Sequence, residues 1–311
     1  MSDKTAAELP ADQDSKTLAI VYQFGKVAST SLVATLNELD GVEAVQSHFL
    51  GKRALGEIFE AMMRPGLPEY FFNHQLGQFT ENARLTRRLN RIRGGQSSQR
   101  LLVLSLTREP LEWFRSSTVQ DIEGYLPRFR HFLNRLGIAY DSDSELVQLA
   151  LTRLMAVFTR VLAAHGGTDA VLKTLASDPA AVFGGSPLQD DADSQAFFYM
   201  MLRPFTWFRQ HFEHTLEIRL DDMAWEDGIL SYSGCSGDYF IFRYEDIGQA
   251  FPACLERLGF RDIPTIQRKN VSSRKRLAQD ADLAFQSPAA DRLRELFRDS
   301  EYARRFGYTG P

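Results

Sequence analysis

Cysteine, net charge and long apolar runs are all scarce in this sequence. Among 311 residues there are two cysteines, Cys235 and Cys254, too few for a disulfide framework, so we expect a reducing compartment. The formal net charge of −4 gives no reason to expect nucleic acid or an anionic membrane as a partner. No apolar run is long enough to suggest a transmembrane segment. Residues 1–16 lack the apolar stretch of a signal peptide and are interpreted as a disordered tail.

Short apolar runs alternate with segments whose apolar residues recur at helical spacing, and this alternation predicts an α/β fold. Strands are expected at residues 17–22, 42–49, 101–106 and 237–244, with weaker candidates at 69–73 and 215–220. Helices are expected at 53–63 and 82–93, over much of a helical middle at about 119–214, and twice in the last 35 residues or so. This order predicts a central parallel sheet flanked by helices in three layers, with a largely helical insertion. We expect residues 17–311 to form a single domain.

Residues 24–32, with the sequence Phe-Gly-Lys-Val-Ala-Ser-Thr-Ser-Leu, lie between the first strand and the first helix. The N–H groups of such a loop and of the helix start point toward an anion. Lys26 adds a positive charge, and Ser29, Thr30 and Ser31 add hydroxyl groups. The segment therefore predicts a phosphate-binding loop.

The loop departs from the usual nucleoside-triphosphate pattern at two positions. Ile20 stands where the first glycine is expected, and Val27 follows the lysine where a Mg²⁺-binding hydroxyl is expected. The sequence thus lacks the metal ligand that ATP chemistry on such loops requires.

A second candidate site follows the strand at 101–106. Arg108 leaves the carboxyl end of that strand, where ligands bind in open α/β sheets. Its guanidinium offers the fork of donors that suits a phosphate. Ser116 comes eight residues later, two turns into a helix that Pro110 is suited to begin. The pair predicts a second phosphate-binding position.

Two further segments are rich in arginine or lysine. In the helix at 82–93, Arg84, Arg87 or Arg88, and Arg91 share one face. We interpret that face as solvent-exposed in preference to an anion site. Residues 268–276 contain five cations and predict a basic loop.

Together these motifs resemble the sulfotransferases that use 3′-phosphoadenosine 5′-phosphosulfate. Lys26, Ala28, Ser29 and Thr30 match the family's 5′-phosphosulfate loop, although Ala28 replaces the usual glycine. Arg108 and Ser116 match the pair that holds the 3′-phosphate, and 242–247 is similar to a scaffold segment whose Glu245 and Asp246 we expect to cap a helix. The resemblance implies a P-loop-like fold and the following donor-binding residues: Lys26, Val27, Ala28, Ser29, Thr30, Ser31, Arg108, Ser116, Ser272, Ser273, Arg274 and Lys275.

The resemblance also implies a mechanism that requires no metal. Lys26 would neutralise the bridging oxygen of the departing nucleotide. His48, at the end of the second strand, is our candidate for the base, and His74 is the alternative. Some relatives use a glutamate near the position of Gln46, which cannot act as a base.

The motif forms are most similar to the carbohydrate and capsular-polysaccharide branch of the family, which implies sulfuryl transfer to a saccharide or glycolipid hydroxyl. Because we find no membrane anchor, we expect a cytoplasmic, bacterial protein. A small-molecule kinase using Mg·ATP, an inactive nucleotide-binding module and an interaction protein remain alternatives. Tyr125, Arg128, Arg130 and His131 either line a sugar site or form a helix surface.

Overall fold

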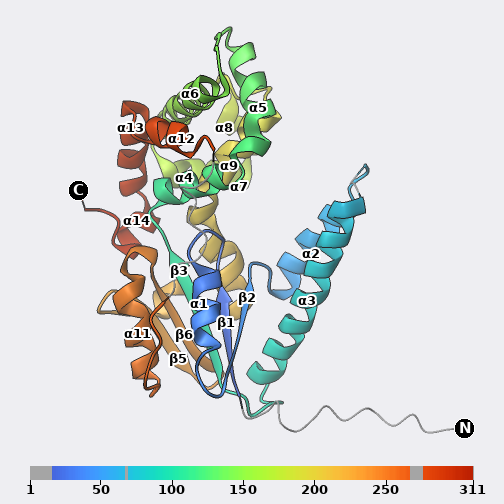
Figure 1. The fold of residues 1–311 in the computed structure, drawn as a ribbon, viewed down its shortest axis with the longest axis vertical. Helices are drawn as coiled ribbons and strands as arrows, with labels where there is room; N and C mark the ends of the chain where they lie inside the picture. The colour runs from blue at the N-terminus through green and yellow to red at the C-terminus, as the bar shows by residue number, and fades with distance from the viewer. Residues whose placement is uncertain (1–15, 67–68, 267–275, 311) are drawn as a thin grey trace, which may run out of the picture. The chain divides into compact units, whose positions relative to one another are not determined.

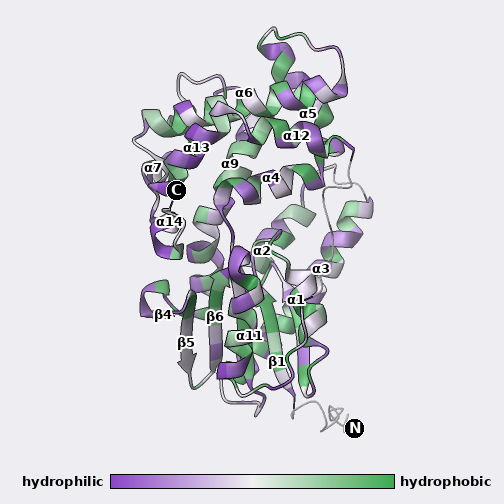
Figure 2. Ribbon diagram, turned by 60° about the vertical axis from the view of Figure 1, so that its left-hand side comes forward, coloured by the Kyte–Doolittle hydropathy of each residue, from purple (hydrophilic) through white to green (hydrophobic). Residues whose placement is uncertain are grey.

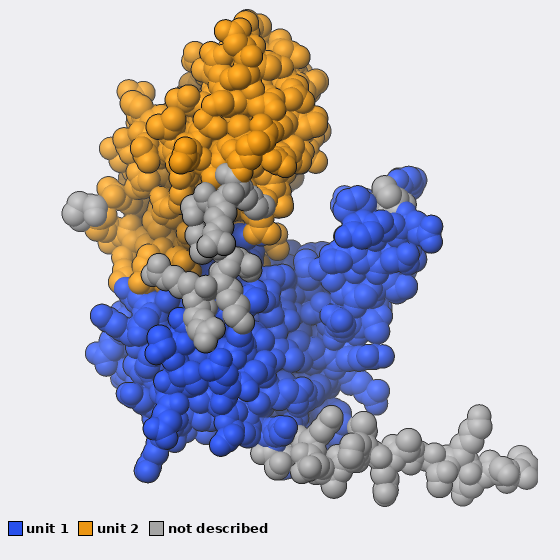
Figure 3. Space-filling model, in the orientation of Figure 1, with its two compact units in different colours: residues 1–106, 211–242, 246–267 blue, residues 107–210, 243–245, 268–311 orange. Residues whose placement is uncertain are grey.

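A computed structural model describes residues 16–66, 69–266 and 276–310 (Figure 1). The chain forms two compact units, coloured separately in Figure 3. Unit 1 comprises Met1–Leu106, His211–Phe242 and Asp246–Gln267, and unit 2 comprises Thr107–Gln210, Arg243–Glu245 and Arg268–Pro311.

A six-stranded sheet forms the centre of unit 1, with strand order β2-β1-β3-β6-β5-β4. Strand β1 is parallel to both β2 and β3, whereas β5 is antiparallel to both β4 and β6. The sheet is therefore mixed, and the prediction of a wholly parallel sheet was wrong. The strand bounds are β1 Thr17–Tyr22, β2 Val42–Ser47, β3 Leu101–Thr107, β4 Ala224–Glu226, β5 Ile229–Gly234 and β6 Gly237–Arg243.

The central strands are the apolar runs seen in the sequence. All seven residues of β3 are buried, as are five of six in β1, which fits strands covered on both faces. Strand β1 is coloured as mostly hydrophobic in Figure 2. At the start of β6, Gly237 has a φ of +147° and a Cβ there would lie 2.5 Å from the Leu101 carbonyl oxygen. Only glycine allows this close approach of β6 to β3.

The sheet continues past β6 through two tight hairpins that we did not predict. Asp227 and Gly228, at φ angles of +51° and +76°, join β4 to β5 in the geometry that an Asp-Gly turn favours. The predicted strand at 215–220 is absent. His214–Leu216 is helical (α10), Glu217 adopts φ +54°, and Leu220–Asp222 forms a 3-10 turn. The strand that pairs with β6 in a hairpin is β5, and not the predicted strand at 215–220.

The helices of unit 1 include a long antiparallel pair beside β2. The predicted strand at 69–73 is wrong, because those residues begin the 25-residue helix α3. Ser47 Oγ donates to Asn82 Oδ1 at 2.5 Å, and Arg88 forms a two-point ion pair with Glu43, its closer contact being 2.5 Å. This ion pair holds the pKa of Glu43 below its usual value. Helix bounds are α1 Ser29–Leu36, α2 Gly51–Met62, α3 Glu69–Arg93 and α11 Ile247–Arg257, the last preceded by a 3-10 turn at Tyr244–Asp246.

Unit 2 is built from helices around an aromatic core. Phe114 lies 5.6 Å from Phe285 and 6.3 Å from Phe158, between ring centroids, and Phe158 lies 5.2 Å from Phe198. The helical middle was predicted, but the C-terminal end has three helices where we expected two. The bounds are α4 Pro110–Gln120, α5 Ile122–Arg135, α6 Asp143–Ala164, α7 Thr168–Ser177, α8 Pro179–Phe183, α9 Ala192–Trp207 with a π-helical segment at Phe208–Glu213, α12 Ala278–Phe285, α13 Pro288–Arg298 and α14 Glu301–Phe306.

Helix α6 is long and apolar enough to cross a membrane by length and composition alone. This finding qualifies the prediction that no such segment exists. More than half of its most apolar stretch, 56%, is buried inside the protein, as expected for the core helix of unit 2.

Candidate anion-binding site at the β1–α1 loop

The loop between β1 and α1 has an unusual backbone. Gly25, Lys26 and Ala28 have φ angles of +93°, +60° and +61°. For Lys26 and Ala28 this left-handed conformation carries a steric cost that glycine would not have. Backbones that mix right-handed and left-handed residues can form anion-binding concavities. The phosphate-binding role of these residues stays a prediction.

The strain at Ala28 gives a stability prediction. Ala28→Gly should raise the free energy of unfolding by about 1 kcal/mol, because relief of the left-handed strain exceeds the entropic cost of glycine. Ala34→Gly, in the interior of α1, is the matched control and should lower it by about 1 kcal/mol. Urea denaturation measures both. If Ala28→Gly also lowers stability, Ala28 is not held in the left-handed region in solution.

Some hydrogen-bond donors of the loop already bond within the protein, and others are accessible to solvent. The N–H groups of Ser31 and Leu32 donate to the Ala28 carbonyl oxygen at 3.0 and 3.1 Å. No side chain caps α1. The side chains of Ser29 and Ser31 are buried, Thr30 is exposed, and Lys26 is half-buried. The side-chain groups of this loop nearest to solvent are therefore those of Lys26 and Thr30.

Val27 is completely buried. It occupies the position at which a metal-binding loop has a hydroxyl. Among the described residues, no group of three or more His, Cys, Asp or Glu side chains is arranged to hold a metal ion.

His48 lies immediately after β2, close to the loop. Its Nδ1 is 2.7 Å from the Gln23 carbonyl oxygen and 3.4 Å from the Gln23 side-chain nitrogen. The shorter contact indicates that Nδ1 carries the proton and donates it to the carbonyl. Nε2 is then unprotonated and accepts from the Gln46 amide at 2.9 Å. Nε2 is therefore the basic nitrogen of the ring, and a substrate hydroxyl would reach it by displacing the Gln46 amide.

Gln23 joins the loop to His48, a role that we did not predict. It is fully buried directly after β1. Its side-chain oxygen accepts from the Gly25 N–H, and its carbonyl oxygen accepts from His48. A polar residue following an apolar strand was the only signal in the sequence. Gln46, which we had considered only as a replaced base, is the donor that orients His48.

The alternative base, His74, lies in a different environment. It is exposed on the N-terminal half of α3, and not at the end of a strand as we had expected. Its backbone is helical because residues 69–73 continue into α3.

In unit 2, Arg108 directly follows β3 and is held by aromatic residues. Its guanidinium lies 4.5 Å above the ring of Tyr244, a cation–π contact. The Tyr302 hydroxyl accepts from the Arg108 N–H at 3.2 Å and donates to the Arg108 carbonyl at 3.0 Å. Burial raises the pKa of Tyr302 well above its usual value, so the hydroxyl stays protonated. The backbone at Arg108 is therefore fixed at both of its polar groups.

The scaffold segment at 242–247 contributes a carboxylate to the surroundings of Arg108. Glu245 accepts from the Glu109 N–H at 3.0 Å and from the Tyr308 hydroxyl at 2.9 Å. Asp246 is the residue before α11, but its side chain makes no capping bond. The expectation that Glu245 and Asp246 cap a helix is replaced by a role for Glu245 beside Arg108.

The remaining predicted residues are scattered. Ser116 lies half-exposed on α4, and Ser272, Ser273, Arg274 and Lys275 fall outside the described residues. Of the residues considered for a sugar site, Arg128 pairs with Asp193 at 3.2 Å and Arg130 with Asp143 at 2.8 Å. These two arginines thus serve contacts within unit 2.

Comparison with protein-family models, with curated proteins and with solved structures found no match. Function is therefore inferred from the residues of the site.

Proposed function

We propose that this chain is a sulfotransferase with a P-loop-like fold that uses 3′-phosphoadenosine 5′-phosphosulfate and a hydroxyl acceptor. One observation carries the proposal. Between a buried parallel strand and a helix, the chain places a half-buried lysine within a loop whose backbone is left-handed at Gly25, Lys26 and Ala28. Such a backbone suits the binding of an anion, and the neighbouring His48 would supply a base.

Each motif has a role in donor binding. The loop N–H groups, with Ser29 and Thr30, would bind the 5′-phosphosulfate. Arg108 would bind the 3′-phosphate through its guanidinium fork, with Ser116 adding a hydroxyl. Ser272, Ser273, Arg274 and Lys275 would complete the 3′-phosphate site.

The reaction is an in-line displacement at sulfur. The acceptor hydroxyl displaces the Gln46 amide from His48 Nε2 and passes its proton to that nitrogen as its oxygen forms a bond to sulfur. The bond between sulfur and the bridging oxygen breaks, and 3′,5′-ADP leaves with the negative charge on that oxygen. Lys26 stabilises this developing charge in the transition state. Since His48 Nδ1 already donates to Gln23, the ring is oriented before substrate binds.

A P-loop kinase is the first alternative. It would need a hydroxyl or carboxylate to hold Mg²⁺ beside the loop. Val27 stands at the hydroxyl position and is buried, which favours the proposal over the kinase.

An inactive binding module is the second alternative. The contacts of His48 with Gln23 and Gln46 favour an enzyme, because a module that only binds nucleotide has no need of a positioned base. We further propose a cytoplasmic location, since both cysteines are free thiols and burial raises the pKa of Cys254 to about 12, keeping it unreactive.

Calorimetric titration with 3′,5′-ADP, set against ATP with and without Mg²⁺, tests the donor class. Metal-independent binding of 3′,5′-ADP supports a sulfotransferase. If the protein binds Mg·ATP and does not bind 3′,5′-ADP, the kinase replaces the sulfotransferase as the proposed function.

A further inference from the structure

Uncompensated positive charge gathers on one face of α3. Arg84, Arg87 and Arg91, here named the basic stripe, are exposed and form no ion pair with any described residue. Some exposed arginines of unit 1 have acidic partners, namely Arg53 with Glu57, Arg100 with Asp238, and Arg219 with Asp221, whereas Arg64 and Arg261 have none among the described residues. The basic stripe differs from these isolated cations because it brings onto one helix face three arginines that have no described acidic partner.

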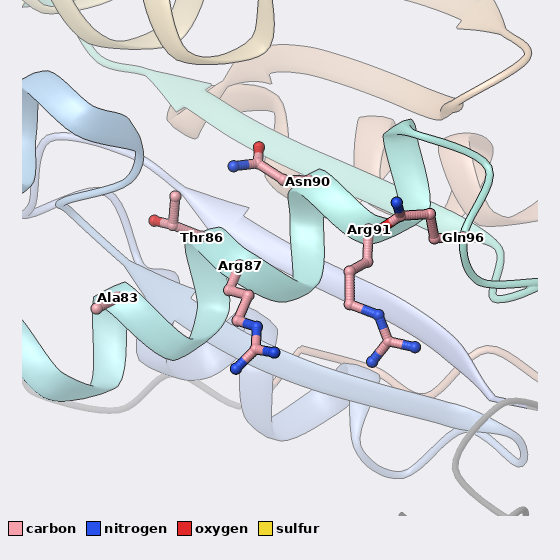
Figure 4. A pocket seen from close by; sticks show the side chains of 6 residues that line it. All are labelled: Ala83, Thr86, Arg87, Asn90, Arg91 and Gln96. Atoms are coloured by element: carbon pink, nitrogen blue, oxygen red, sulfur yellow. The ribbon is translucent and has the colours of Figure 1, made fainter. Parts of the chain in front are cut away.

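A hollow lies along the stripe. It has a volume of about 500 Å³ and is lined by Ala83, Thr86, Arg87, Asn90, Arg91 and Gln96. Figure 4 shows Arg87 and Arg91 projecting from the same side of α3, with Thr86 and Asn90 projecting from the opposite side in that view. The Gln96 N–H donates to the Arg91 carbonyl at 2.8 Å, which fixes the turn that closes one end. The α3 hollow thus combines two guanidinium forks with two amides and a hydroxyl.

The basic stripe begins on the part of α3 near His48, the candidate base, and extends from there along the helix. Helix α3 runs antiparallel to β2, with Asn82 beside Ser47 at the end of the strand and Arg88 beside Glu43 near its start. Ser47 is the residue before His48. From Arg84 to Arg91 the helix rises about 10 Å. An extended ligand on the stripe would therefore run along the edge of the sheet toward His48.

We infer that the basic stripe and the α3 hollow bind a linear acidic glycan, a saccharide chain carrying carboxylate or sulfate groups. The inference rests on the proposed function and names its acceptor class. Guanidinium forks suit carboxylates and sulfates, and the amides and Thr86 suit sugar hydroxyls. This assignment replaces our interpretation of the face as merely solvent-exposed.

The lining disfavours other polyanions. Bases of single-stranded nucleic acid bind by stacking on aromatic side chains, and no aromatic residue is among the described residues that line the hollow. Acidic peptides usually require an apolar pocket for an anchoring side chain, and within the described part of the chain Ala83 is the only apolar lining residue. The net charge of −4 also opposes general attraction to nucleic acid.

Fluorescence polarisation with a labelled oligogalacturonate tests the inference on the whole chain. Arg87→Gln/Arg91→Gln should weaken binding on the order of tenfold and flatten its salt dependence, because two charge-assisted contacts are lost. The matched control is Arg64→Gln/Arg261→Gln, which removes two exposed arginines of unit 1 that have no ion pair with described residues. It should bind nearly as the wild type does. A methyl-esterified, neutral oligomer should not bind.

Three results would overturn the glycan assignment: equal loss in the control pair, equal binding of the neutral oligomer, or tighter binding of single-stranded DNA of the same charge. Titration with 3′,5′-ADP separates the two proposals. If 3′,5′-ADP binds and the acidic oligomer does not, the glycan site is wrong and the donor assignment stands. If the acidic oligomer binds at the stripe and 3′,5′-ADP does not, the donor assignment fails alone.

Discussion

Lys26→Ala is expected to lower kcat by about 10²- to 10³-fold, the loss seen when a group that stabilises transition-state charge is removed. The charge on the bridging oxygen appears only as the bond to sulfur breaks, so the lysine contributes far more to the transition state than to donor binding. Binding of 3′,5′-ADP should fall much less than kcat. Steady-state kinetics with saturating donor, together with 3′,5′-ADP titration, measure the two effects separately.

Lys52→Ala is the matched control, since Lys52 is exposed on α2 and should leave both quantities unchanged. Alanine at position 26 keeps a non-glycine residue in the left-handed conformation, so the loop strain is retained. An effect of Lys26→Ala confined to KM would contradict the leaving-group role, because uniform binding changes KM without kcat.

His48→Ala should lower turnover by about 10²- to 10⁴-fold, the usual contribution of a positioned general base. Binding of 3′,5′-ADP should be nearly unchanged, because His48 acts on the acceptor. The exposed His74 on α3 provides the matched control, and His74→Ala should retain turnover. If His48→Ala retains turnover, His48 is not the base. If His74→Ala loses turnover, His74 takes that role.

His48 also holds the loop through Gln23, and a second variant separates that role from catalysis. Asparagine can keep a donor near the position of Nδ1, and so keep the bond to the Gln23 carbonyl, but it has no counterpart of Nε2. His48→Asn should therefore be as inactive as His48→Ala. If His48→Asn recovers turnover, His48 is a positioning residue and not the base.

The sequence was sufficient to predict the buried strands and the helices between them. β1, β3 and β6 are short apolar runs with clear boundaries, and Pro110 begins α4 as expected. The segment at 69–73 misled us because a short aromatic run does not distinguish a strand from a helix. Tyr70 and Phe71 are in fact largely exposed on α3. The β4–β5 hairpin had a usable signal in Asp227-Gly228, which we overlooked.

Within the candidate site, the motif names residues but does not give their conformation. Lys26, the hydroxyls after it and His48 are the residues that the motif predicts. Left-handed backbone at Lys26 and Ala28 does not, because both residues ordinarily avoid it. The link from Gly25 through Gln23 to His48 is a tertiary contact between β1 and β2 that no local pattern encodes. The same holds for the Tyr302 bonds that fix Arg108.

The most direct measurement is calorimetric titration with 3′,5′-ADP in EDTA, on the wild type, Arg108→Ala and Arg160→Ala. We predict metal-independent binding by the wild type that weakens on the order of a hundredfold in Arg108→Ala, since a charged fork to phosphate is lost. Arg160, exposed on α6, is the control and should leave binding unchanged. No heat with 3′,5′-ADP, and binding of ATP only with Mg²⁺, would contradict the account and make the chain a kinase.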